Sequence, residues 1–238
     1  MTYRPDIDGL RAVAVVPVLF FHAGFSSWAG GFLGVDIFFV ISGYLITGLV
    51  WRAIGRGTFS IAGFYERRFK RLMPVLFAVL VATTLASGVI LFPEALQAYG
   101  RDLIGVCTYV SNVVSWRSID YFASAAELSP LLHAWSLSIE EQFYVVHPLL
   151  LLAVFRLFPS RPGWVLGALA FGSFALAAWM VGANADAAFY VLPTRAWELC
   201  AGAWLAVVWP IGSPAPRGSA VAAALSWVGL AAVGVAIG

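Results

Sequence analysis

The chain has 238 residues, of which 61% are hydrophobic and only 11% are charged, and its mean hydropathy is +0.89. A soluble domain carries about 25% charged residues, so this composition excludes a soluble enzyme and indicates an all-α protein with several membrane-spanning helices. The net charge of +2 gives no reason to expect a nucleic-acid partner.

The first apolar segment, DGLRAVAVVPVLFFHAGF at 8–25, has Arg11 near its start and His22 near its end. Eleven residues amount to three helical turns plus about 20°, so the two side chains share one face, about 16 Å apart along the axis. A face lining a protein cavity could carry them, whereas a face turned to lipid would not. The alternative is structural: Arg11 reaches the lipid headgroups and His22 makes an interhelical hydrogen bond.

Further apolar runs predict seven or eight membrane helices, each near the roughly 20 residues that a bilayer requires. The stretch 103–116 is shorter and fits either a span or a re-entrant or buried helix. Residues 1–29 loosely resemble a signal peptide, but the second span follows closely, which favours an uncleaved first helix. The predicted spans are 10–25, 33–51, 72–92, 138–158, 164–182, 191–209 and 219–238.

The connection 52–71 holds six basic residues against one acid, and the positive-inside rule places it in the cytoplasm. The N-terminus is then cytoplasmic too, and the uncharged turn AGFSSWAGG at 23–31 lies outside. The loop with Arg156 and Arg161 also favours the cytoplasmic side. The two basic loops can both lie in the cytoplasm only if 103–116 does not cross the membrane. We therefore favour a stretch at 103–116 that does not span it.

Two ionisable residues lie close to the outer turn of the first hairpin. His22 is about one helical turn before it, and Asp36 is about one turn into the returning helix, so a contact at equal depth is expected. A carboxylate beside an imidazole fixes its tautomer and stabilises the imidazolium, which suits a general base. The structural alternative is a hydrogen bond between two packed helices.

The segment LLHAWSLSIEEQFYVVHP carries two adjacent acids, Glu140 and Glu141, at the start of an apolar run, with His147 two turns after Glu140. Each acid at mid-membrane costs about 2.5–3.5 kcal/mol, and one Leu offsets only about 0.5 kcal/mol. The pair is tolerable in a polar cavity or near an interface, which Trp135 and Tyr144 suggest. An exposed helix start explains one acid well and two adjacent acids poorly.

Two other charged groups have both a structural and a functional interpretation. The cluster YERRFKRLMP either anchors a helix to anionic lipids or binds a phosphate-rich cytosolic ligand through Arg68 and Arg71, one turn apart. Arg195 and Glu198, in VLPTRAWELCAG, are three residues apart and are expected to form a local ion pair. Pairing would let both enter the membrane beside a polar interior.

Several of these segments occur together in one known family. The chain resembles the acyltransferase-3 family of membrane acyltransferases, and most closely the bacterial branch that O-acetylates surface polysaccharides. Several motifs in register over residues 3–209 make the resemblance specific. The matching segments are YRPDIDGLRAVAVVPVLFFHAG, GGFLGVDIFFVISGYLIT, FYERRFKRLMP, LLHAWSLSIEEQFY and PTRAWELCAG.

The resemblance implies a bundle of about ten helices, an acyl-CoA donor on the cytoplasmic side and a carbohydrate acceptor on the other side. It maps an Arg-x10-His motif onto Arg11 and His22, and an Arg-x-x-Arg motif onto Arg68 and Arg71. We therefore expect a single acyltransferase domain over 1–238, without a metal. It would transfer an acetyl or other acyl group to a hydroxyl of polysaccharide, lipopolysaccharide or peptidoglycan.

The resemblance and the residue chemistry together predict individual roles. His22 is the expected general base, and Asp36 orients it. Three arginines are expected to bind coenzyme A. A carboxylate is expected to assist the transfer or to hold the acceptor. The residues concerned are Arg11, Arg68 and Arg71 for the donor, Glu140 and Glu141 for the transfer, and Trp135, Ser136, Tyr144, Arg195 and Glu198 for substrate binding.

Some choices stay open at this stage. The last apolar run stops at Gly238 without a flanking charge, so the family's final helices, and the extracytoplasmic hydrolase-like domain of many members, are expected to be missing. Direct displacement and an acyl-enzyme are both open. The alternative function is a transporter or flippase, although no internal repeat favours it. A non-catalytic scaffold would leave the intramembrane ionisable residues unexplained. The expected location is a bacterial inner membrane, with the N-terminus in the cytoplasm.

Overall fold

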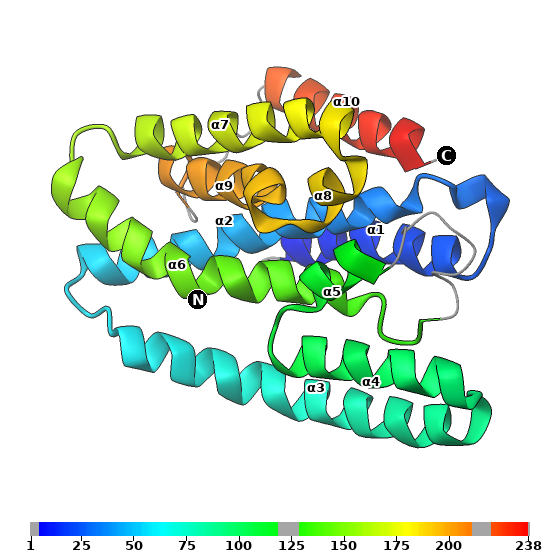
Figure 1. The fold of residues 1–238 in the computed structure, drawn as a ribbon. Helices are drawn as coiled ribbons and strands as arrows, with labels where there is room; N and C mark the ends of the chain where they lie inside the picture. Colours follow the sequence, from blue (N-terminus) through cyan, green and yellow to red (C-terminus); the bar gives the residue numbers. More distant parts are fainter. Residues whose placement is uncertain (1–4, 119–128, 211–219, 238) are drawn as a thin grey trace. The chain divides into compact units, whose positions relative to one another are not determined.

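A computed structural model describes residues 5–118, 129–210 and 220–237. Every regular element in these ranges is helical, which confirms the all-α class (Figure 1). Two short 3-10 helices, η1 (Ser26–Trp28) and η2 (Gly31–Leu33), connect the first two α-helices. The α-helices are α1 (Pro5–His22), α2 (Gly34–Gly55), α3 (Ile61–Ile90), α4 (Pro93–Cys107), α5 (Ser111–Ser118), α6 (Ala134–Leu157), α7 (Pro162–Ala183), α8 (Ala185–Tyr190), α9 (Leu192–Val208) and α10 (Ala220–Ile237).

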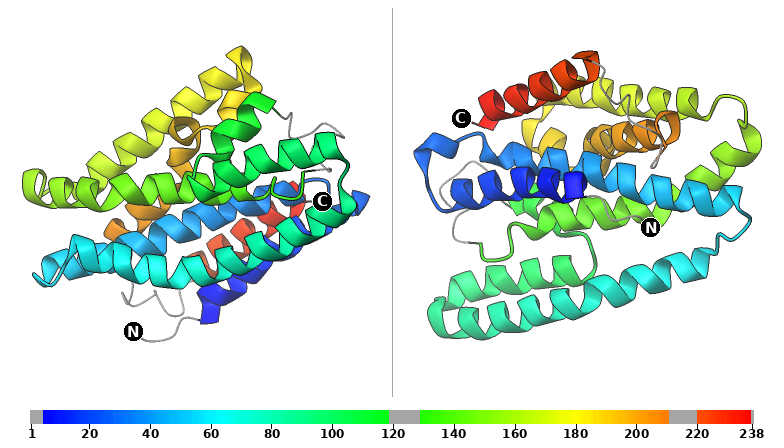
Figure 2. Two further views of the ribbon diagram at one scale, coloured as in Figure 1. Left: turned by 60° about the horizontal axis from the view of Figure 1, so that its bottom comes forward. Right: turned by 180° about the vertical axis from the view of Figure 1, so that it is seen from behind.

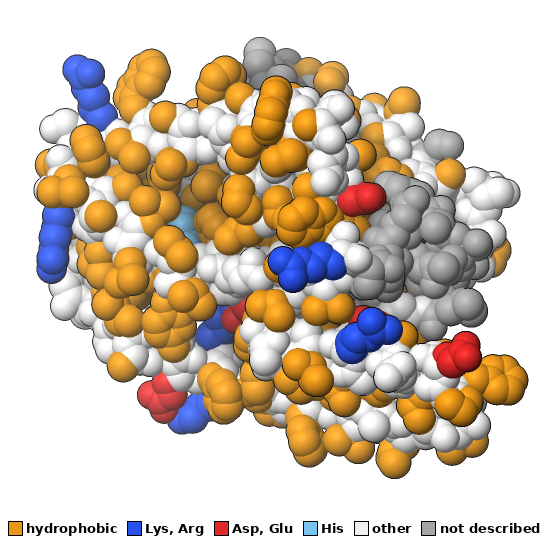
Figure 3. All heavy atoms as spheres, viewed as in Figure 1, with side chains coloured by type: hydrophobic (Ala, Val, Ile, Leu, Met, Phe, Trp, Pro, Cys, Tyr) orange, Lys and Arg blue, Asp and Glu red, His pale blue; other side chains and the backbone are white. Residues whose placement is uncertain are grey.

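Four helical segments of the described chain are long and apolar enough to cross a membrane: 26–55, α3, α6 and α7. The apolar part of α10 is shorter, and α9 has 17 residues. Hydrophobic side chains are widespread on the face drawn in Figure 3, in keeping with a lipid environment. The predicted membrane helical bundle is confirmed, and four of its seven or eight expected spans reach full length.

Two helix boundaries differ from the expectation. α3 begins at Ile61, eleven residues before the predicted span 72–92, because the Ser60 side chain caps it by accepting a hydrogen bond from the Gly63 N–H (3.2 Å). The basic cluster is therefore helical. The stretch 103–116 is not one helix, since α4 ends at Cys107 and α5 begins at Ser111. Neither piece has the roughly 20 residues of a span.

The chain divides into two compact units, residues 1–48 with 198–238, and residues 49–197. In the first unit, α1 and α2 form a hairpin whose glycines permit close packing. A Cβ on Gly31 would lie 2.3 Å from the carbonyl oxygen of Pro17, and one on Gly34 would lie 2.1 Å from that of Ala14. The glycine-rich turn is therefore a packing requirement of the hairpin.

α2 and α9 approach each other closely at two glycines of the first unit. A Cβ on Gly43 would lie 2.0 Å from the Leu199 carbonyl oxygen, and one on Gly202 would lie 2.0 Å from the Val40 carbonyl oxygen. Small residues at a crossing let two membrane helices make backbone contact, which gives dispersion energy that lipid cannot supply.

In the second unit, α3 and α4 form an antiparallel hairpin (Figure 2). Thr84 Oγ1 and the Tyr99 hydroxyl are hydrogen-bonded across it at 2.7 Å. Tyr99 and Val106 belong to a buried cluster that reaches Ala134 at the start of α6. α6 packs in turn against α5 and α8. This packing surrounds the beginning of α6, where the two adjacent glutamates lie, with other helices.

Replacing Gly43 or Gly202 by alanine should destabilise the first unit, because the added Cβ meets a backbone carbonyl that cannot rotate away. We expect a loss of about 3 kcal/mol, at the upper end of overpacking effects, measured as a lower Tm of the detergent-solubilised protein. Gly172→Ala on α7 is the matched control, since a Cβ there meets nothing within 4 Å. Its Tm should be unchanged or slightly raised. Equal Tm values for all three variants would contradict the close crossing.

Candidate active site

A charged pair joins α3 to α6 in the second unit. Arg68 donates from Nε to both carboxylate oxygens of Glu141, at 2.8 and 3.1 Å, and from Nη2 to Oε1. The two side chains are only 21% and 13% exposed, whereas those of the Lys70–Glu66 pair on α3 are 72% and 62% exposed. This two-nitrogen geometry is available to arginine and not to lysine.

The pair lies within the length of both helices. Tyr65, one turn before Arg68, donates its hydroxyl to the carbonyl of Val145, one turn after Glu141 (2.7 Å), so α3 and α6 run antiparallel. Glu141 is about 10 Å from the start of α6 and about 24 Å from its end, from its place in the helix. The acid that seemed too costly for a membrane helix therefore has a cation beside it.

Tyr144 places the two adjacent glutamates in different surroundings. Its ring centroid lies 3.6 Å from the guanidinium carbon of Arg68, a cation–π contact. Its hydroxyl donates to Glu140 Oε1 at 2.8 Å. Glu141 thus contacts a guanidinium, whereas Glu140 contacts a phenol. The group formed by Arg68, Glu140 and Glu141 contains one formal positive charge and two formal negative charges.

A buried hydrogen-bond network ties α5 and α8 to α6. Gln142 donates from Nε2 to Asn112 Oδ1 and to the Tyr109 carbonyl, both at 2.8 Å. Asn112 is 1% exposed and donates from Nδ2 to the Tyr190 carbonyl at 3.0 Å. Sequence reasoning missed these residues, because uncharged amides and tyrosines in apolar segments carry no charge signal. A polar residue within an apolar run was the one signal available.

Two of the predicted substrate-binding residues come together in the second unit. The Arg195 guanidinium carbon lies 5.8 Å from the Trp135 ring centroid and 5.4 Å from that of Phe189. The two rings are 4.8 Å apart and belong to α6 and α8. Phe189, which the sequence did not single out, therefore completes an aromatic group around a cation.

The other predicted residues are more scattered. The Ser136 hydroxyl donates to the His133 carbonyl at 3.1 Å, and Glu198 is fully buried on α9. Arg71 is exposed and has no hydrogen bond or ion pair with any residue that the structure describes. In the described ranges, no three or more His, Cys, Asp and Glu side chains are grouped as a metal site would require.

α1, in the first unit, carries both Arg11 and His22 on one helix, as predicted. Arg11 Nη1 lies 3.9 Å from an Asp8 carboxylate oxygen. His22 Nδ1 lies 2.8 Å from the Val18 carbonyl oxygen. A carbonyl only accepts, so Nδ1 carries the hydrogen and, in the neutral ring, Nε2 keeps its lone pair. The neutral His22 ring is exposed, and its Nε2 atom can accept a proton.

The expected contact between His22 and Asp36 is not found among the described residues. The Val18 carbonyl, one turn back on α1, takes the Nδ1 hydrogen that the sequence interpretation gave to Asp36. A helix supplies this acceptor locally, and sequence spacing alone does not reveal it. Asp36 lies in the first turn of α2, where a carboxylate also suits the helix dipole.

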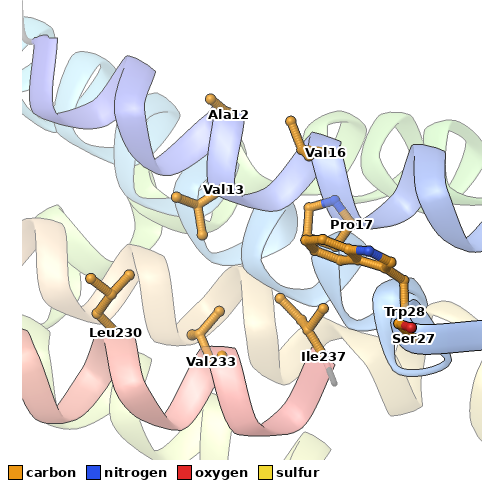
Figure 4. Close-up of a pocket in the computed structure, with 10 residues that line it drawn as sticks. Ala12, Val13, Val16, Pro17, Ser27, Trp28, Leu230, Val233 and Ile237 are labelled. Carbon is orange, nitrogen blue, oxygen red and sulfur yellow. The ribbon is translucent and has the colours of Figure 1, made fainter.

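An apolar groove of about 660 Å³ lies between α1 and α10 (Figure 4). Val13 of α1 points toward Val233 of α10, and Trp28 lies beside one end. No lining residue is titratable, and helical periodicity puts the groove on the side of α1 opposite His22. The candidate chemistry and the groove thus occupy different faces of the helix.

The family model described as an acyltransferase domain matches residues 4–238. The chain belongs to the acyltransferase 3 family. This confirms the resemblance seen in the sequence motifs, and it leaves the transporter or flippase alternative without support. No solved structure matches the chain.

Relatives with curated names extend this family assignment. Peptidoglycan O-acetyltransferase OatA of Listeria monocytogenes is 39% identical over 221 residues, which cover 90% of this chain and 35% of the relative. The putative peptidoglycan O-acetyltransferase YrhL of Bacillus subtilis is 38% identical, covering 88% and 34%. O-acetyltransferase OatA of Staphylococcus aureus is 38% identical, covering 87% and 35%. The chain therefore spans about a third of the length of these relatives.

Removing one charge of the Arg68–Glu141 pair should destabilise the second unit. Glu141→Gln leaves a mostly buried guanidinium without its counter-charge, and we expect a loss of about 3 kcal/mol, measured by thermal unfolding in detergent. The double variant Arg68→Gln with Glu141→Gln should recover part of the loss, because no unpaired charge is left.

Glu66→Gln provides the matched control, because it breaks an exposed ion pair on the same helix. Its effect should be at most about 1 kcal/mol. If Glu141→Gln were as mild as Glu66→Gln, the α3–α6 pair would not stabilise the fold.

Proposed function

We propose that the protein transfers an acetyl group from an acyl-CoA donor to a hydroxyl group of cell-envelope carbohydrate, with peptidoglycan as the first candidate acceptor. Family membership supports acyl transfer, the names of the three relatives support an acetyl group, and two of those names support a peptidoglycan acceptor. The single observation that carries the proposal is the hydrogen bond from His22 Nδ1 to the Val18 carbonyl, which prepares Nε2 as a base.

In the proposed reaction, His22 Nε2 removes the proton of the acceptor hydroxyl. The oxygen then attacks the thioester carbonyl, the carbon–sulfur bond breaks, and the departing thiolate takes the proton back from the imidazolium. The same base serves a direct displacement and the second half of an acyl-enzyme route. Asp36 remains a proposed partner that stabilises the imidazolium through its charge, and not through the Nδ1 hydrogen bond.

The two glutamates are assigned different roles. Glu141 is engaged by Arg68, so its proposed role is to position that arginine. Glu140 accepts the Tyr144 hydroxyl and is the carboxylate that we propose to assist the transfer or to hold the acceptor.

The donor is assigned to the arginines of the two family motifs, and the pairing of each one in the structure ranks them. Arg71 is the first candidate because the described residues leave its charge unpaired, and Arg11, with only a long contact to Asp8, is the second. Arg68 would contact a part of the donor other than its phosphates, through the Nη1 nitrogen that Glu141 leaves open. Bidentate contact with phosphate would favour arginine over lysine at Arg71 and Arg11.

The acceptor is assigned to residues that combine aromatic and polar groups. Trp135 and Arg195 lie together with Phe189, and they offer a ring and a cation to a polar ligand. Ser136 and Glu198 are also proposed as substrate contacts, because they lie in the segments that resemble the family.

The protein is an integral membrane protein, and we propose that it lies in a bacterial inner membrane with its N-terminus in the cytoplasm. The basic connection at 52–71 and the uncharged turn at 23–31 support this orientation. Ser27→Cys should react with an impermeant thiol reagent added to cells whose outer layers admit it. Thr58→Cys should not react, and the reverse pattern would invert the topology.

His22→Gln and His22→Ala should insert normally and still bind acetyl-CoA, but they should lose carbohydrate acetylation by about 10²-fold or more, which is the usual value of general-base catalysis. The measurement is the acetyl ester content of the cell wall in a null strain that carries each variant of the complete protein at matched membrane levels.

Ser27→Ala, on the exposed turn of the same hairpin, is the matched control and should acetylate normally. Asp36→Asn should fall between the wild type and His22→Gln, because it keeps the shape and removes the charge. Near-normal acetylation by His22→Gln would end the general-base assignment.

A further inference from the structure

The junction between α4 and α5 breaks a local rule at Tyr109. The Tyr109 N–H donates to the Val106 carbonyl (3.1 Å) and the Val110 N–H donates to the Gly105 carbonyl (2.8 Å). These two bonds are the Schellman arrangement that closes a helix C-terminus. The residue at its left-handed position is normally glycine, but here it is Tyr109, with φ at +55°.

A tyrosine at this position is unfavourable for the backbone. Among the described residues it is the one non-glycine residue with positive φ. A side chain in the left-handed region costs about 1–2 kcal/mol, and such costs persist mainly where the side chain serves a function. Glycine would form the same turn without this cost. We therefore look for a role of the tyrosine side chain that offsets the backbone strain.

The turn at Tyr109 lies beside the charged cluster of α6. Gln142, the residue after Glu141, donates to the Tyr109 carbonyl at 2.8 Å and fixes the turn against α6. Gln142 is about 12 Å inside α6, which is a candidate span. Irregular backbone at membrane depth is tolerated where it is buried in protein or lines a polar cavity.

The side chain of Tyr109 is half-buried, and its hydroxyl makes no hydrogen bond with any described residue. Burial raises the pKa of the phenol, and the charges of Glu141 and Arg68 both act on it, in opposite directions. The hydroxyl is therefore protonated at neutral pH and available as a donor next to the Arg68–Glu141 pair.

We infer that Tyr109 is a substrate-contacting residue whose hydroxyl donates a hydrogen bond to a neutral oxygen of the acyl donor, such as an amide or thioester carbonyl. This inference rests on the proposed function. A neutral oxygen is specified because the protonated phenol brings no positive charge, and the charge of Arg68 beside it is already matched by Glu141. The donor phosphates belong instead to Arg71.

The test compares the Kd for acetyl-CoA of the purified protein and its variants. Tyr109→Phe keeps the ring and the backbone conformation but removes the hydroxyl, so Kd should rise about 3- to 10-fold, the value of one neutral hydrogen bond, with Tm unchanged. Arg71→Gln is the positive control, with a larger rise. Tyr99→Phe is the matched control: its hydroxyl is bonded to Thr84, so Tm should fall and Kd should stay constant.

The backbone strain at Tyr109 is measured separately, through thermal stability. Tyr109→Gly and Tyr109→Ala both remove the side chain, but only glycine relieves the left-handed strain, so its Tm should be about 2–4 °C higher. A wild-type Kd for Tyr109→Phe, or equal Tm values for the glycine and alanine variants, would overturn the inference. A wild-type protein that binds acetyl-CoA and acetylates no peptidoglycan would overturn the proposed function, while the Kd comparison would still decide the role of Tyr109.

Discussion

The ion pair between Arg68 and Glu141 is the interaction around which the second unit is organised. A carboxylate inside a membrane helix is costly unless a cation meets it, and a guanidinium at that depth has the same need. Pairing satisfies both, and its geometry sets the register of α3 against α6. Tyr144 covers the guanidinium with its ring and at the same time directs its hydroxyl to Glu140.

This pair also explains why polar groups accumulate nearby. Once α6 is held in register, Gln142 reaches the turn between α4 and α5, and Asn112 reaches the end of α8. Each buried amide has a protein partner, which a low-dielectric environment requires. The result is a polar region enclosed by apolar helices.

The first unit supplies a different element, an exposed imidazole on a helix end. Its tautomer is set by the helix itself, through the Val18 carbonyl four residues earlier. Close glycine packing of α1 on α2, and of α2 on α9, holds this helix with backbone contacts. Packing that depends on glycine leaves little freedom for the helix to rotate, so the position of His22 is determined by residues that carry no chemistry.

The sequence by itself determined the membrane class, the helical content, the place of most helices and the family, because hydropathy, charge placement and ordered motifs are local properties of the chain. It also singled out Arg68, Glu141, Arg195 and Trp135 as candidate functional residues. Only the tertiary structure decided which groups these residues contact. Glu141 pairs with Arg68, and Arg195 lies over the Trp135 ring. His22 donates to the Val18 carbonyl instead of to Asp36. The break at Tyr109 was likewise not predicted, since 103–116 has no glycine or proline at the turn, and Gln142 holds this turn from 33 residues away. The chemistry of a side chain shows that it requires a hydrogen bond or a counter-charge when it is buried. Helix packing determines which group provides it.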